Sequence, residues 1–117
     1  MIPETRLRDV IGRPVSAIAF VHDYVELHFD GPIVRALAAP CVRRGDVATN
    51  FPGCGSRDAL CELIGRNVVN VIVREGEDIE LRFDGDASVR IPLAEESRIG
   101  PEAAHFVPGE NQPIEVW

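Results

Sequence analysis

The chain contains one stretch of sequence twice. Residues 7–15 match residues 60–68 with five identities, and residues 25–31 match residues 79–85 with five more. The offset is 53 residues in the first pair and 54 in the second, so one residue is inserted between them. Self-similarity at a nearly fixed spacing indicates one structural unit used twice. The repeat therefore predicts two pseudo-symmetric halves.

Each half, at about 3–38 and about 56–94, is predicted to begin with a short helix. Apolar residues at i, i+3 and i+4 form a single stripe, and a glycine in the left-handed conformation is expected to end the helix. Pro3 suits the first position of one helix, and Ser56 is the expected N-cap of the other. The stripes and their closing glycines are Leu7, Val10, Ile11 and Gly12, then Leu60, Leu63, Ile64 and Gly65.

Three strands are predicted after each helix. Residues 15–21 and 68–73 are apolar at nearly every position, which predicts strands covered on both faces. The next strands alternate, with Val25, Leu27 and Phe29 on one face, and Ile79, Leu81 and Phe83 in the second half. An Asp-Gly turn then leads to a third strand, at about 33–37 and 88–93.

These patterns predict a single domain of the α+β class, mainly β. We expect the two helix-strand-strand-strand repeats to form one curved, six-stranded antiparallel sheet or a partly open barrel, with two short helices at one end or face. Outside the repeats, residues 40–55 are expected to be a long connecting loop, which favours a functional role. The tail, 95–117, is predicted to hold a helical turn at 102–106 and an edge strand at 114–117, with Trp117 packed on the body of the protein.

Charge limits the classes of partner. The 117 residues carry 19 acids and 12 bases, a net charge of −7, which argues against nucleic-acid binding and favours a basic protein partner. The chain lacks an apolar run of the ~20 residues that a membrane helix needs, and it begins without a signal-peptide pattern. We therefore expect a soluble, cytoplasmic protein that does not bind membranes. Pairing of an edge strand with a second copy would give a homodimer.

Three cysteines are the main candidates for chemistry. Cys54 lies between two glycines just before the second predicted helix, whose N-terminus would favour a thiolate. With a histidine as base it would serve as the nucleophile of a small hydrolase or transferase. Cys41, Cys54 and Cys61 with one histidine could instead hold zinc, but their spacing lacks a close pair of ligands. Sequence motifs for nucleotides or metalloproteases are absent, so we predict no cofactor and no metal.

The candidate interaction residues lie at two kinds of position. Four are predicted on the solvent faces of the alternating strands, in equivalent places of the two halves, where oppositely charged pairs are also ordinary surface features. Three belong to the long connection. The seven are Glu26, His28, Glu80 and Arg82, and then Arg43, Arg44 and Phe51.

The doubled pattern Ile-Gly-Arg-x-Val followed by Glu-Leu-x-Phe-Asp-Gly resembles small uncharacterised bacterial families built on a repeated Gly-x-x-Val…Leu-x-Phe-x-Asp-Gly unit. The resemblance implies a compact β-rich fold and no activity or catalytic residues. Together with the charge, it favours a non-enzymatic binding domain, of an immunity or accessory type that masks a basic partner. The cysteine enzyme at Cys54 is the alternative.

Overall fold

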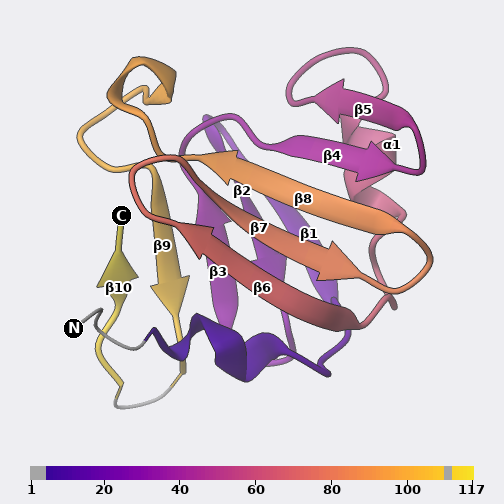
Figure 1. Ribbon diagram of the computed structural model, residues 1–117, viewed down its shortest axis with the longest axis horizontal. Helices are drawn as coiled ribbons and strands as arrows, with labels where there is room; N and C mark the ends of the chain where they lie inside the picture. Colours follow the sequence, from indigo (N-terminus) through magenta and orange to yellow (C-terminus); the bar gives the residue numbers. More distant parts are fainter. Residues whose placement is uncertain (1–4, 110–111) are drawn as a thin grey trace.

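The computed structural model describes residues 5–109 and 112–117, so Pro3 lies outside the described residues. The fold is mainly β and consists of two five-stranded antiparallel sheets that are not closed into a barrel (Figure 1). The first sheet has the order β1-β2-β3-β9-β10, with β1 Ala17–Val21, β2 Tyr24–His28, β3 Ile33–Ala36, β9 Ala104–Val107 and β10 Glu115–Val116. The second has the order β5-β4-β8-β7-β6, with β4 Cys41–Arg44, β5 Val47–Asn50, β6 Val68–Arg74, β7 Asp78–Phe83 and β8 Ala87–Pro92.

The prediction of one six-stranded sheet or partly open barrel is therefore wrong. Each predicted three-stranded meander stays together, β1-β2-β3 in one sheet and β6-β7-β8 in the other. Each sheet is then extended by the hairpin that follows the other meander along the chain, since β4 pairs with β8 and β9 pairs with β3. This exchange of hairpins gives each meander two further strands, so that the meanders need not pair with each other.

The two segments outside the repeat are strands rather than loops. Residues 40–55, expected to be a connecting loop, contain the β4–β5 hairpin, in which Val42 is fully buried. The expected helical turn at 102–106 is instead strand β9, where Ala104 and Phe106 point into the core and His105 does not. Alternating burial of this kind stabilises a strand in place of a helix. The predicted last edge strand is confirmed as β10.

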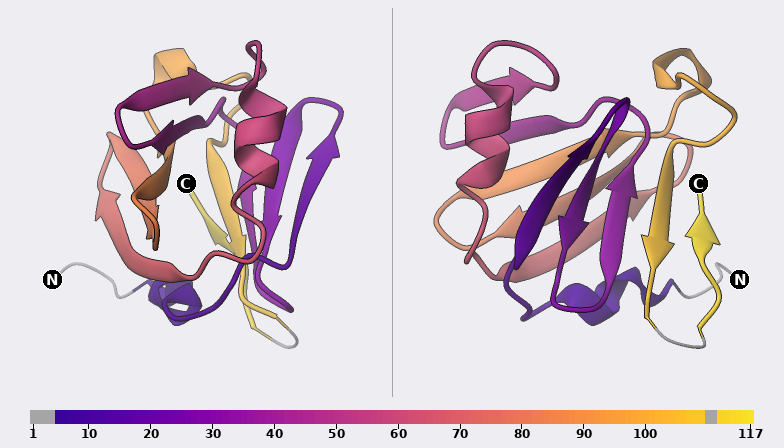
Figure 2. Two further views of the ribbon diagram at one scale, coloured as in Figure 1. Left: turned by 90° about the vertical axis from the view of Figure 1, so that its right-hand side faces the viewer. Right: turned by 180° about the vertical axis from the view of Figure 1, so that it is seen from behind.

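The helical segments are shorter and more varied than predicted. The first is a 3-10 turn, η1 (Arg6–Val10), the second is the α-helix α1 (Ser56–Cys61), and a further 3-10 turn, η2 (Glu95–Ser97), follows β8. Gly55, with φ of +82°, is the N-cap of α1 in place of Ser56, whose side chain is buried without a hydrogen-bond partner. In Figure 2, α1 lies between the β1 edge of the first sheet and the β4–β5 hairpin, and it contacts both.

The segments that follow η1 and α1 cross each other through matched hydrogen bonds. Gly12 N–H donates to the carbonyl of Val68 at 2.7 Å, and Gly65 N–H donates to that of Val15 at 2.8 Å. Both glycines have positive φ, +87° and +90°, as their predicted role in ending the helices requires. The crossing joins the two halves through backbone hydrogen bonds close to the start of each meander.

Strands β1 and β6 are edge strands, and the prediction that both their faces are covered is wrong. In β1 Phe20 and Val21 are each 38% exposed, and in β6 Val69 is 54% exposed. The alternating strands β2 and β7 agree with prediction, because Val25, Leu27, Ile79 and Leu81 are fully buried. A continuous apolar run therefore did not distinguish a central strand from an edge strand.

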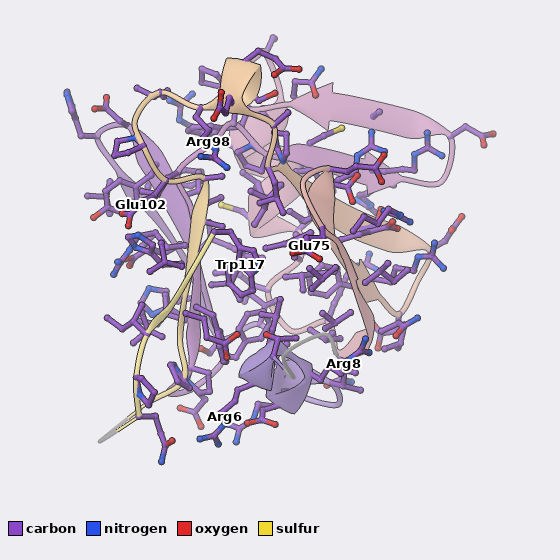
Figure 3. All side chains as sticks on the ribbon, turned by 60° about the vertical axis from the view of Figure 1, so that its left-hand side comes forward. Arg6, Arg8, Glu75, Arg98, Glu102 and Trp117 are labelled. Atoms are coloured by element: carbon purple, nitrogen blue, oxygen red, sulfur yellow. The ribbon has the colours of Figure 1, made fainter. Side chains whose placement is uncertain are left out.

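Trp117 packs against the edge of the core, as expected. Its backbone N–H donates to the carbonyl of Ala104 at 2.9 Å. Its side chain is partly buried between the two sheets (Figure 3). Within the described part of the chain, every helix is too short to cross a membrane.

Candidate functional site

A groove of about 570 Å³ lies between α1 and the β4–β5 hairpin. Its apolar floor includes Val42, which is fully buried, and Ala59 of α1. Its rim carries acidic side chains from α1 and from the turn between β7 and β8. A volume of this size lies within the ~300–1,000 Å³ range of ligand-binding pockets. We call it the α1 groove.

Two turns close one end of the α1 groove. Gly45, in the β4–β5 turn, donates its N–H to the carbonyl oxygen of Asp86, in the β7–β8 turn, at 2.9 Å. Both residues have positive φ, +57° and +58°, a conformation that glycine and aspartate tolerate. This hydrogen bond holds the backbone of Asp86 against the hairpin and places its carboxylate at the rim.

The rim of the α1 groove has an excess of negative charge. Asp58 of α1 and Glu62, the C-cap residue that follows α1, lie four residues apart and so are on the same side of the helix. Glu62 forms an ion pair with Arg44 of β4, whereas Asp58 and Asp86 have no ion-pair partner among the described residues. Three carboxylates and one guanidinium give the rim a formal charge of −2. The groove can therefore accept a cationic group above an apolar floor.

The predicted interaction residues of the first sheet belong to a self-contained polar row. Glu26 accepts hydrogen bonds from Arg35 Nε at 2.8 Å and from His28 Nε2 at 3.0 Å. Burial alone would raise the pKa of Glu26, but the hydrogen bonds from Arg35 and His28 and their charges outweigh it and lower that pKa. Arg35 also donates to His105 Nδ1 at 3.0 Å, and His105 Nε2 donates to Glu102 at 2.8 Å.

The second sheet has an equivalent row around Glu80. This carboxylate accepts hydrogen bonds from Arg82 at 2.8 Å and Arg74 at 2.9 Å. Burial again opposes these bonds, and their net effect is to lower the pKa of Glu80. Glu80, Arg43 and Cys41 line a cavity of about 220 Å³ on this face. Because Glu26 and Glu80 are each paired within their own row, these two carboxylates explain sheet stability more directly than ligand binding.

The candidate nucleophile, Cys54, is exposed in the loop before α1. The three histidines lie at the first sheet, near Asp23, Glu26 and Glu102, and among the described residues no hydrogen bond joins any of them to Cys54. All three cysteines are free, and no group of described residues has the makeup of a metal site.

Phe51, predicted as an interaction residue, is buried instead of lying at the surface. Its side chain is 8% exposed and its ring stacks on Phe20 at 5.9 Å between centroids. The Arg57 guanidinium lies 5.2 Å from the Phe51 ring centroid, within the range of a cation–π contact. Phe51 thus anchors the loop that leads into α1.

Sequence reasoning missed Asp58, Glu62 and Asp86. The i, i+4 spacing of the first two in a predicted helix was a usable signal. Asp86 gave none, because only the approach of two distant turns brings it to the α1 groove. Comparisons of the chain with protein-family models, with curated proteins and with solved structures each give no match. The fold and the groove define a mainly β domain with an acidic cleft.

Proposed function

We propose that this protein is a non-enzymatic binding domain that engages a basic protein partner through the α1 groove. The observation that carries the proposal is a pair of carboxylates, Asp58 and Asp86, at the rim of the groove above its apolar floor. Neither carboxylate has an ion-pair partner among the described residues. An accessory or immunity role, in which the domain masks a basic surface, fits the net charge of −7. Long-range attraction would also speed association at low salt.

The makeup of the α1 groove favours arginine or lysine side chains of the partner. Their aliphatic stems can lie on Val47, which is 67% exposed, and on Ala59, while the charged ends reach the carboxylates at the rim. Arginine adds bidentate hydrogen bonds to a carboxylate. The existing pair between Arg44 and Glu62 is on the same rim, so an incoming guanidinium would replace or extend a contact of the same kind.

The proposal treats the two halves as an internal duplication of the type seen in the bacterial families that the sequence resembles. Support comes from hydrogen bonds at matched positions. Arg66 N–H donates to the carbonyl of Leu63 at 2.9 Å, and Arg13 N–H donates to that of Val10 at 2.9 Å. The α1 groove lies between α1 of the second half and the β4–β5 hairpin that follows the first half, so this hairpin builds one wall of the site.

The test compares two double variants that remove the same charge. Asp58→Asn with Asp86→Asn neutralises the groove, whereas Glu95→Gln with Glu96→Gln neutralises exposed acids of η2, outside the groove. Tagged proteins are used to capture partners at low salt from lysate of the cells that produce the protein, with quantitative mass spectrometry.

We expect a basic protein that the wild type and the η2 variant retain and that the groove variant loses by roughly tenfold, equivalent to ~1.4 kcal/mol. Purified partner should then bind with an affinity that falls as salt rises. Equal capture by both variants would show that the groove is not the binding site.

A further inference from the structure

A third cavity, of about 240 Å³, lies at the first sheet and shares no residue with the α1 groove. It is formed where the β1–β2 turn and the end of β3 meet the segment that joins η2 to β9. Its apolar lining is Tyr24, Leu37, Ile99 and Pro101. Ile99 is 74% exposed, the highest value among the large apolar side chains of the described residues.

The segment that covers this cavity is fixed by hydrogen bonds. Arg98 donates from Nε to the carbonyl of Leu93 and from Nη1 to the carbonyl of Pro101, both at 3.0 Å. Figure 3 shows Arg98 and Glu102 on this same segment. On the other side, Leu37 N–H donates to the carbonyl of Ala103 at 2.9 Å. Hydrogen bonds thus fix the segment between η2 and β9 next to the sheet, with the cavity between them. This arrangement favours a pre-formed binding site.

The charged groups that line the cavity are both carboxylates, Asp23 and Glu102. One oxygen of Glu102 accepts the hydrogen bond from His105, and its second oxygen has no hydrogen-bond donor among the described residues. Among the described residues neither carboxylate forms an ion pair with an arginine, and Asp23 Oδ1 lies 3.4 Å from His22 Nε2. Arg35 binds Glu26 and lies 5.6 Å from the Tyr24 ring centroid, and Arg98 binds backbone carbonyls.

From this lining we infer that the cavity binds a primary alkylammonium group. The alkyl chain would contact Tyr24, Leu37 and Ile99, and the ammonium would donate hydrogen bonds to Glu102 and Asp23. A cavity of about 240 Å³ is below the ~300 Å³ at which drug-sized pockets begin, so it suits one such chain. The same chemistry is presented by a free alkylamine and by a lysine side chain.

The test uses n-butylammonium chloride as the free amine and Nα-acetyl-lysine methylamide as the lysine side chain. Each is titrated into the ¹⁵N-labelled full chain at constant ionic strength, with n-butanol as the neutral control of equal length. We expect the amide signals of Tyr24, Ile99 and Glu102 to shift together, with a dissociation constant on the order of 1 mM for so few atoms. The probe that binds more tightly identifies the source.

Matched variants separate this site from general attraction to an acidic protein. Asp23→Asn with Glu102→Gln should weaken n-butylammonium binding roughly fivefold, as expected for two partly exposed charges. The side-chain amide oxygen introduced by Glu102→Gln can still accept the hydrogen bond from His105. Glu95→Gln with Glu96→Gln should leave binding unchanged. The inference is overturned if n-butanol gives the same shifts, if the shifts are spread over all acidic surfaces, or if both variants weaken binding equally. None of these outcomes depends on the α1 groove.

Discussion

Leu60 of α1 gives the most direct test of how the helical segments close the two-sheet core. Its side chain is fully buried and belongs to the central cluster. Leu60→Ala removes three carbon atoms, worth about 2.4 kcal/mol at ~0.8 kcal/mol each. The cavity left behind adds to this, and measured Leu→Ala losses run from ~2.7 to ~5.0 kcal/mol. We expect a loss of about 3 kcal/mol in the free energy of unfolding.

The expected change in melting temperature follows from the chain length. At ~2.1 cal/mol/K per residue, 117 residues give an unfolding entropy of about 0.25 kcal/mol/K. A loss of about 3 kcal/mol therefore lowers Tm by about 12 °C, measured by calorimetry or by circular dichroism. Urea unfolding should show a lower midpoint with an unchanged slope.

Two substitutions serve as controls for Leu60→Ala. Leu7 of η1 is also fully buried, so Leu7→Ala should cost a similar amount although η1 is only a 3-10 turn. Ile64 is 48% exposed, so Ile64→Ala should cost under about 1 kcal/mol, near the range of surface substitutions. If Leu60→Ala costs no more than Ile64→Ala, α1 does not cover the core in solution, and the reasoning fails.

Two further predictions concern acid stability and thiol reactivity. The folded-state pKa values of Glu26 and Glu80 are below the ordinary 4.5, so their stabilisation is present above pH 4.5 and is lost as pH falls through the lowered values. Urea unfolding from neutral pH to about pH 3 should therefore show a smaller loss for Glu26→Gln or Glu80→Gln than for wild type or Glu95→Gln; equal losses would contradict this. In a native thiol titration read by intact mass, Cys54 and Cys61, which are exposed, should react before the half-buried Cys41. Faster reaction of Cys41 would contradict its lower exposure. Slow reaction of the thiols that becomes fast when a chelator is added would show that they bind a metal ion.

The candidate sites were predictable to different degrees. The alternating pattern placed Glu26 and Glu80 on solvent-facing positions, where both lie in polar rows. It could not show that these rows are self-paired, because Arg35 meets His105 only after β9 pairs with β3. The long connection was expected to be a loop, but its residues form the β4–β5 hairpin, which is one wall of the α1 groove.

Local features of the chain were determined by the sequence itself. Glycines that adopt positive φ and alternating strands arise from neighbouring residues, and they were readable without tertiary contacts. Gly12, Gly65 and the buried faces of β2 and β7 are examples. The mainly β class follows from the same local patterns.

Only the tertiary structure decided which strands are neighbours. Every strand offers the same backbone donors and acceptors, so pairing depends on packing between residues distant in sequence. The choice of β8 as the partner of β4, and of β3 as the partner of β9, divided the strands into two sheets. That exchange left β1 and β6 at edges, brought Asp86 beside Gly45, and created both cavities, because each is lined by segments that meet only when the hairpins are exchanged.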